Sequence, residues 1–156
     1  MSLDLLVNQI HLIPVIARLK YDEFAYMVPG KNVEQFEDGL RTHLNHTELP
    51  LTYVRVNELQ EFIGTFSLRL HDLDSHRHLT PWLASVVVSP DQRRQWIGEY
   101  LVREAEKKAA EMGIKTLYLF TPNKEAWYQK LGWQTIEKSF LNTIPITIMQ
   151  KQLVLN

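Results

Sequence analysis

Cysteine is absent from the 156 residues of this chain, and neither sign of charge is in strong excess. Without cysteine the chain can form no disulfide, no thiolate nucleophile and no cysteine-ligated zinc site. The formal net charge of −1 argues against a nucleic-acid partner, because proteins that bind nucleic acid usually carry a basic excess that displaces counterions. These absences exclude thiol chemistry and indicate that nucleic acid is not a partner.

Long apolar runs are missing as well. No segment reaches about 18 consecutive apolar residues, the length that would suggest a membrane span. The first residues, MSLDLLVNQIHLIP, contain a short apolar run interrupted by Asp4, with no basic stretch before it and no small-residue cleavage site. The sequence therefore predicts a cytoplasmic protein with no membrane partner.

The composition is that of a folded protein. Apolar residues make up 45% and charged residues 22% of the chain, which is ordinary for a globular domain. A chain of this length can bury roughly 70% of the surface that its unfolded form exposes. We therefore expect a single domain over residues 1–156, without internal repeat, low-complexity segment or linker.

Two helices are predicted in the first third of the chain. Apolar side chains at helical spacing predict the first over Ile10–Phe24. The second follows Asn32, which forms a capping-box pattern with Gln35. We expect this second helix to end near Asn45.

Segments rich in β-branched and aromatic residues follow. Residues 51–56 and 62–70 flank a short polar stretch, which predicts a β-hairpin. The uncharged run LASVVV, residues 83–88, is typical of a central strand that is covered on both faces. After it, apolar residues recur at helical spacing from Ile97, and Gly113 predicts a left-handed helix end.

The segment TLYLFT, residues 116–121, predicts a further buried strand. Together with the strand at 83–88 and the helix between them it makes a βαβ unit, so we expect the two strands to be parallel neighbours. The fold class is α/β, a mixed sheet with helices on both faces. The remaining predicted elements are a short helix over 124–131 and strands over 133–138 and 144–153.

The segment SVVVSPDQRRQWIG, residues 85–98, joins the central strand to its helix. The first N–H groups of a helix lack acceptors and carry about half a positive charge, which suits them to bind a phosphate. Arg93 and Arg94 add donors beside the same end. Taken alone, this pattern more often marks an ordinary strand-to-helix turn with a solvated basic pair.

The longer segment 85–133 resembles the acyl-CoA-binding core of the GNAT superfamily of N-acetyltransferases, bacterial type. That pattern is a strand, V-x-P, then R-x-x-G-x-G/A opening a helix, and later Y-x-x-x-G-F/W. The resemblance implies a GNAT-like, mostly antiparallel twisted sheet with a central parallel strand pair. The matching residues are Val88, Pro90, Arg93, Gly98, Leu101, Tyr128, Gly132 and Trp133.

The resemblance implies that backbone N–H groups hold the pyrophosphate of acetyl-CoA, a co-substrate. One residue departs from the pattern, because Trp96 stands where the family has its first glycine. If the φ of Trp96 is negative, its backbone donor is unaffected, and we expect the side chain to flank the CoA groove. The alternative is that Trp96 marks lost or altered CoA binding. The residues assigned to the pyrophosphate are Arg93, Arg94, Gln95, Trp96, Ile97, Gly98 and Glu99.

The family also implies roles in catalysis. A splay between two parallel strands would leave the backbone N–H groups of Val86, Val87 and Val88 for the pantetheine arm and the thioester carbonyl, with Asn123 also bonding that arm. Tyr128 occupies the position from which family members protonate the departing thiolate, a role that suits a phenol with a pKa near 10. The alternative is that Tyr128 is a packed aromatic whose hydroxyl caps a backbone group.

The general base is harder to assign, because residues 81–88 contain no carboxylate. His71, Asp72 and Asp74 are the nearest titratable candidates, and Asp72 is our candidate base. A solvated loop role for each, or loss of the amine proton to ordered water, remains the alternative. Glu23 and Tyr26 are expected on the acceptor side.

Two histidines, His76 and His78, lie in a polar loop without further ligands and predict exposed side chains and no metal site. Trp82 is expected to pack in the core. The sequence thus predicts an enzyme that transfers acetyl from acetyl-CoA directly to a primary amine of a small molecule or peptide, as a monomer or homodimer. The competing hypothesis is an inactive acyl-CoA-binding or protein-interaction module.

Overall fold

Seven strands form one sheet in the computed structural model, which describes residues 2–93 and 96–154. The strand order is β1-β2-β3-β4-β5-β7-β6. The strands are β1 (Ser2–Leu5), β2 (Leu51–Val56), β3 (Phe62–Arg69), β4 (Trp82–Val88), β5 (Thr116–Thr121), β6 (Gln134–Leu141) and β7 (Ile144–Gln152). The α-helices are α1 (Ile13–Phe24), α2 (Val33–Arg41), α3 (Ile97–Glu111) and α4 (Glu125–Lys130).

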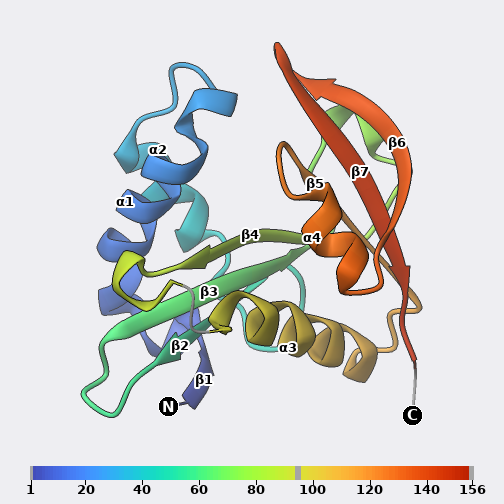
Figure 1. The fold of residues 1–156 in the computed structure, drawn as a ribbon. Coiled ribbons are helices and arrows are strands. Elements are labelled where there is room, and N and C mark those ends of the chain that lie inside the picture. Colours follow the sequence, from blue (N-terminus) through green and yellow to red (C-terminus); the bar gives the residue numbers. More distant parts are fainter. Residues whose placement is uncertain (1, 94–95, 155–156) are drawn as a thin grey trace.

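The predicted parallel pair is confirmed, since β4 and β5 are parallel and the neighbours in all other strand pairs are antiparallel. Figure 1 shows α1 and α2 above β2–β4 and α3 below them. Val54 packs with α1 and α2 in one core, whereas Leu68 packs with α3 in another. Helices therefore cover both faces, as predicted. Among the described residues, no helix is long and apolar enough to cross a membrane.

The helix pair α1 and α2 follows the prediction closely. A 3₁₀ turn over Ile10–Leu12 leads into α1. The capping box of α2 is formed, because Asn32 Oδ1 accepts from the Gln35 N–H at 2.9 Å and Gln35 Oε1 accepts from the Asn32 N–H at 2.8 Å. The predicted end near Asn45 is wrong, however. The N–H of His43 bonds to a carbonyl three residues back, which tightens the chain into a turn after α2.

Strand β1 was not expected from the sequence. It pairs antiparallel with β2, with Ser2 opposite Val56. Four residues are too few for an alternating pattern to stand out, so the strand is defined by its partner rather than by its own sequence. The β6–β7 hairpin has a longer first strand than predicted, reaching Leu141.

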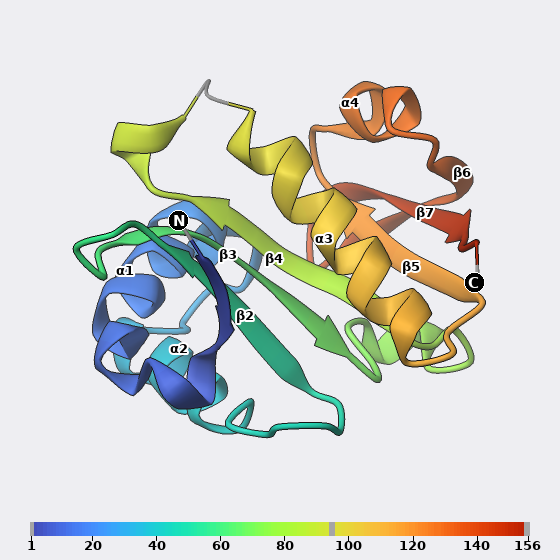
Figure 2. The ribbon, with the colours of Figure 1, turned by 90° about the horizontal axis from the view of Figure 1, so that it is seen from below.

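Helix α3 packs closely against β3 and β4, an arrangement that Figure 2 shows from below. The close approach is made at a glycine, since a Cβ on Gly64 would lie 2.7 Å from Leu101 Cδ1 and would force that side chain to shift. The helix ends as predicted at Gly113, whose φ is +83°. The N–H of Ile114 bonds to the Ala109 carbonyl at 3.1 Å, which completes the Schellman motif.

Candidate active site

The parallel strands β4 and β5 diverge after a short shared stretch. Within residues 2–93 and 96–154 their register pairs Trp82 with Tyr118 alone. Strand β4 also contains a bulge, because three residue steps from Ala84 to Val87 oppose two steps on β3. Ser85 at the bulge has a φ of +56°. A bulge interrupts the ladder and bends its strand. The centre of the sheet is therefore open where regular pairing would close it.

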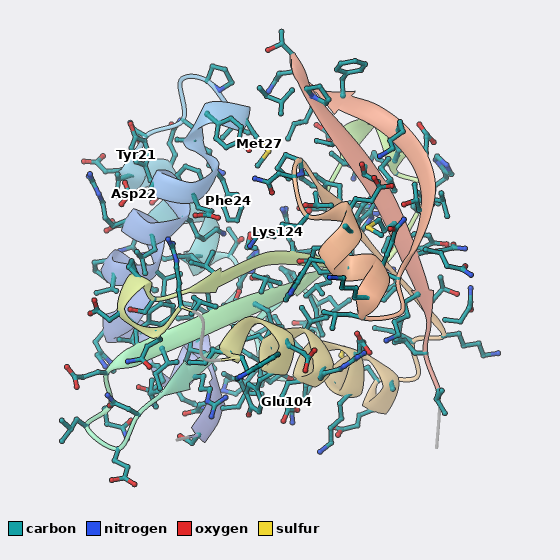
Figure 3. All side chains as sticks on the ribbon, viewed as in Figure 1. Tyr21, Asp22, Phe24, Met27, Glu104 and Lys124 are labelled. Atoms are coloured by element: carbon teal, nitrogen blue, oxygen red, sulfur yellow. The ribbon has the colours of Figure 1, made fainter. Side chains whose placement is uncertain are left out.

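A cavity of about 990 Å³ occupies this opening. One wall comes from β4, the start of α3 and the loop from β5 into α4; the other comes from α1, the following 3₁₀ turn η3 (Ala25–Met27) and the end of β3. Figure 3 shows Phe24 and Met27 on the side of α1 and η3 toward α4, Lys124 across from them, and Tyr21 and Asp22 on the outer side. The cavity thus separates the early part of the chain from the late part.

Every predicted cofactor residue that the structure describes lines this cavity. Arg94 and Gln95 lie outside the described residues. Of the candidate bases, only Asp72 lines it, together with Glu23 and Tyr26 from the expected acceptor side. The cofactor residues on the wall are Val86, Val87, Val88, Arg93, Trp96, Ile97, Gly98, Glu99, Asn123 and Tyr128.

The start of α3 differs from the expectation in one respect. Trp96 has a φ of +64°, so the condition of a negative φ, under which its backbone donor would be unaffected, is not met. It keeps the left-handed backbone that glycine adopts most easily, and its side chain is 82% exposed. Among the described residues, no side chain caps the helix, and the Tyr100 N–H is the donor to the Trp96 carbonyl. Within the same part of the chain, the N–H groups of Ile97, Gly98 and Glu99 have no acceptor.

Tyr128 is buried in α4 and lines the cavity. Its ring packs edge-on against Trp127 and Trp133, with centroid distances of 4.9 and 6.1 Å. Burial raises the pKa of Tyr128 above its ordinary value, so the hydroxyl stays protonated but is a weaker acid than the phenol with a pKa near 10 that the sequence led us to expect. Its hydroxyl makes no hydrogen bond to another residue in the described part of the chain. The structure thus gives no support to the alternative in which this hydroxyl caps a backbone group.

Asp72 lies in a group of charges at the other wall. Arg69 Nη1 donates to Asp72 Oδ1 at 2.7 Å, and the side chain of Asp72 is 11% exposed. Burial raises the pKa of Asp72, and the nearby cations Arg69, Lys20 and Lys31 oppose this shift. Asp74, by contrast, is fully exposed and pairs with Arg77 at 3.1 Å. The sequence could not separate these two aspartates, but the structure does.

The cations Lys20, Lys31 and Arg69 were not found by sequence reasoning. All three line the cavity. Burial lowers the pKa of Lys20 to about 8, with further lowering by repulsion from Lys31 and Arg69. A signal for Lys20 was present, because it continues the buried stripe of α1 formed by Ile13, Ile16 and Ala17. Lys31 and Arg69 carry no such signal.

Two contacts join the walls across the opening. Asn142, in the β6–β7 turn, donates through Nδ2 to the Met27 carbonyl at 2.7 Å. Arg93, ahead of α3, lies 3.6 Å from Glu23 at the end of α1. These contacts hold the early and late parts of the chain on either side of the cavity.

Of the remaining predictions around the site, some are confirmed and one is wrong. Trp82 is fully buried and donates to the Leu79 carbonyl, so its core role is confirmed. The expected exposure of His76 is wrong, because it is buried and bonds to Ser75 and, at 2.9 Å, to Glu137 of β6. His78 is exposed and stacks on it. Among the described residues, no group of three or more His, Asp or Glu side chains could hold a metal ion.

The open centre of the sheet, the bulge and the uncapped helix match one family. Residues 15–133 match the acetyltransferase (GNAT) family. The chain belongs to this family. The resemblance inferred from residues 85–133 is thereby confirmed and extends over most of the sequence.

Curated relatives match over shorter stretches. The amino-acid acetyltransferase of Edwardsiella ictaluri is 34% identical over 59 residues, which are 38% of this chain and 13% of that protein. The amino-acid acetyltransferase of Yersinia enterocolitica is 34% identical over 74 residues, 47% of this chain and 15% of that protein. The chain therefore matches only a small part of the length of these relatives.

Solved structures share the whole fold. An aminoglycoside 6'-N-acetyltransferase complexed with coenzyme A superposes with a TM-score of 0.77 and 16% identity, covering 100% of this chain and 99% of that one. N-acetylglutamate synthase from Neisseria gonorrhoeae, complexed with coenzyme A and N-acetyl-glutamate, gives a TM-score of 0.69 and 19% identity, covering 92% of this chain and 33% of that one. At such identities the likeness establishes the fold.

Proposed function

We propose that this chain binds acetyl-CoA in the cavity beside β4 and transfers the acetyl group directly to a primary amine of a small molecule or peptide. The observation that carries the proposal is the bulged, splayed β4, which opens the sheet beside the uncapped start of α3. An acyl-CoA needs both features, since its pantetheine arm can pair with strand backbone and its pyrophosphate with helix N–H groups. Membership of the family supports the same conclusion.

The donor would lie along the wall made by β4 and α3. Backbone N–H groups of residues 96–99 would bind the pyrophosphate, with Arg93, Arg94 and Gln95 beside them. Val86, Val87 and Val88 would bind the pantetheine arm and the thioester carbonyl through their backbone, and Asn123 would bond the same arm. Arg93 would then exchange its exposed pairing with Glu23 for a phosphate, a change that costs little because exposed ion pairs are weak.

The reaction needs no covalent enzyme intermediate. The amine nitrogen attacks the thioester carbonyl carbon, a C–N bond forms, and the C–S bond breaks. The amine proton passes to Asp72, directly or through water, and a proton passes from the Tyr128 hydroxyl to the CoA thiolate. The raised pKa of Asp72 makes it a stronger base than an ordinary carboxylate, and the hydroxyl of Tyr128 has no competing acceptor among the described residues.

The proposal covers primary amines in general and does not name the acceptor. The relatives are described as amino-acid acetyltransferases, whereas the solved structures include enzymes described as acting on aminoglycosides and on spermidine or spermine. One observation favours a second candidate, an acyl-CoA-binding module without turnover. The exposed indole of Trp96 stands at the mouth of the CoA groove, where a smaller residue would leave more room.

The deciding experiment is a calorimetric titration of the protein with acetyl-CoA, without acceptor, followed by turnover assays across a panel of amines. We expect micromolar affinity and transfer to at least one amine. Gly98→Val is the informative variant, because the family pattern already accepts alanine at this position and a larger side chain is needed for the test. A Cβ on Gly98 would lie 3.5 Å from Trp127, in ordinary contact. A branched side chain there would hold the pyrophosphate away from the backbone, so acetyl-CoA affinity should fall about tenfold.

The matched control is Gly39→Val in α2, where the added Cβ meets nothing within 4 Å and acetyl-CoA affinity should not change. Absence of acetyl-CoA binding by the unaltered protein would refute the proposal. Binding without turnover on any amine would support the module instead.

A further inference from the structure

The acceptor wall has more cationic than anionic side chains. Lys20, Lys31 and Arg69 line it, and Asp72 is the carboxylate that faces them. The nearby Glu23 is engaged by a fourth cation, Arg93. The two lysines are partly buried and the side chain of Arg69 is 42% exposed. Grouping partly buried cations around one carboxylate costs free energy, so such a cluster favours the binding of an anion.

The same cluster lies away from the place where the phosphates of a CoA would bind. Strands β3 and β4 are antiparallel, with Arg69 opposite Trp82 and Gly64 opposite Val88. The interval from Trp82 to Val88 spans roughly 20 Å of strand. Arg69 therefore lies at the start of β4, whereas α3 follows the end of β4. The cations are placed for the acceptor rather than for the phosphates of the donor.

The state of Lys20 agrees with a missing anion. Its pKa is lowered to about 8 by burial and by the neighbouring cations, and Asp72 offsets this in part. Burial and repulsion from Arg69 also lower the pKa of Lys31. No hydrogen bond joins Lys20 to another side chain in the part of the chain that is described. A bound carboxylate would favour the charged form of both lysines.

We propose that the acceptor amine carries a carboxylate, as an amino acid does, and that Lys20, Lys31 and Arg69 bind this carboxylate. The inference rests on the proposed function and specifies its substrate class. The ammonium or amine of such a molecule would lie toward Asp72 and its carboxylate toward the lysines, so a zwitterion matches the mixed charge of this wall. A polycationic amine would meet repulsion from the same side chains.

The test compares each amino acid with its own carboxamide. With acetyl-CoA saturating, kcat/KM is measured for the standard L-amino acids and for their amides, which keep the amine and lose the anion. For the best acceptor we expect a preference for the acid of at least tenfold. Lys20→Gln and Lys31→Gln should each lower kcat/KM for that acid at least fivefold and leave the amide within twofold. Lys20→Arg should retain the preference.

The matched control is Arg18→Gln. Arg18 lies on the same helix as Lys20, and its substitution removes the same charge. Its side chain is exposed outside the cavity and pairs with Asp22 at 3.4 Å. It should leave both rates unchanged. A merely structural role of Lys20 would lower the two rates equally, which contradicts the proposal, and thermal melting of each variant identifies loss of folding.

A binding measurement separates this inference from the proposed function. The N-acetyl derivative of the preferred amino acid has no titrating amine, and its affinity for the CoA-bound protein should fall as the pH rises through about 8. The titratable and charged groups near Lys20 are Lys31, Arg69, Asp72 and His43. The pKa of His43 is lowered to about 3, so His43 is neutral in this range, and Lys31 loses positive charge in the same direction as Lys20 when the pH rises. Equal or faster acetylation of amides, spermidine or aminoglycosides would overturn the inference alone. No acetyl-CoA binding would overturn the proposed function.

Discussion

The two walls of the cavity use different chemistry. The wall made by β4, α3 and α4 presents backbone groups and apolar or aromatic side chains, with Val87 and Tyr128 among its buried members. The opposite wall presents charged side chains around Asp72. The first suits a long ligand held through main-chain contacts, and the second suits a small ligand recognised by charge.

This difference explains why one wall is recognisable as a sequence motif and the other is not. Backbone recognition needs a strand, a turn and a helix in immediate succession, so its residues are contiguous and form a motif. The charged wall is assembled from α1, the loop before α2 and the end of β3. Arg69 lies 38 positions after Lys31, and no spacing rule links the two residues. A sequence therefore reveals the donor more readily than the acceptor.

The largest expected effect is on the wall that binds the donor. Tyr128→Phe removes the proposed acid and keeps the ring between Trp127 and Trp133. We expect kcat to fall about 100-fold, because general acid catalysis contributes at least that much, with acetyl-CoA affinity nearly unchanged. Steady-state kinetics and calorimetry measure the two quantities. Tyr118→Phe, whose ring packs on Trp82 outside the cavity, is the control. Unchanged turnover in Tyr128→Phe would refute the assignment of Tyr128 as the general acid.

On the charged wall, Asp72→Asn should lower kcat/KM about tenfold, a smaller effect because water can take part of the amine proton. In the unaltered protein the acid limb of the pH profile should lie above the ordinary carboxyl pKa, since burial raises the pKa of Asp72. That limb should move or vanish in the variant. Asp74→Asn removes an exposed carboxylate two residues away and should change neither. An identical profile in both variants would remove Asp72 from the mechanism.

The charge behind this wall also predicts acid sensitivity. Buried His43 bonds to Thr52 at 2.8 Å, and burial, with repulsion from Lys20 and Arg69, lowers its pKa to about 3. The unfolded chain binds this proton near pH 6.5, so the stability contribution is complete above that pH and is lost as the pH falls toward 3.

The free energy of unfolding should therefore drop by up to about 1.4 kcal/mol per pH unit from this group, as measured by urea denaturation between pH 7 and 4. His43→Gln, which can keep the bond to Thr52, should flatten the slope. His46→Gln, at an exposed histidine three residues on, should not. An unchanged slope in His43→Gln would show that other groups govern acid unfolding.

Much of the fold could be predicted from the sequence, because its signals were local. The capping box at Asn32 and the stop at Gly113 are fixed by neighbouring atoms. Strand β1 and the charged wall could not be predicted from the sequence, since each depends on partners far along the chain. His76 was misjudged for the same reason, because its partner Glu137 lies 61 residues away.

Trp96 is the one place where the donor wall itself departs from its motif, and here the expected effect is smallest. A left-handed backbone costs a bulky residue roughly 1–2 kcal/mol, and glycine removes this strain. Glycine also loses more entropy on folding, which offsets part of the gain. Trp96→Gly should thus stabilise the protein by less than about 1 kcal/mol and change acetyl-CoA affinity by less than tenfold, about 1.4 kcal/mol. Trp96→Ala removes the same indole but keeps the strained backbone, so the difference between the two variants isolates the backbone. A gain of several orders of magnitude in affinity, shared by both, would show that the indole obstructs the groove, and the donor wall would then belong to a protein that no longer turns over acetyl-CoA.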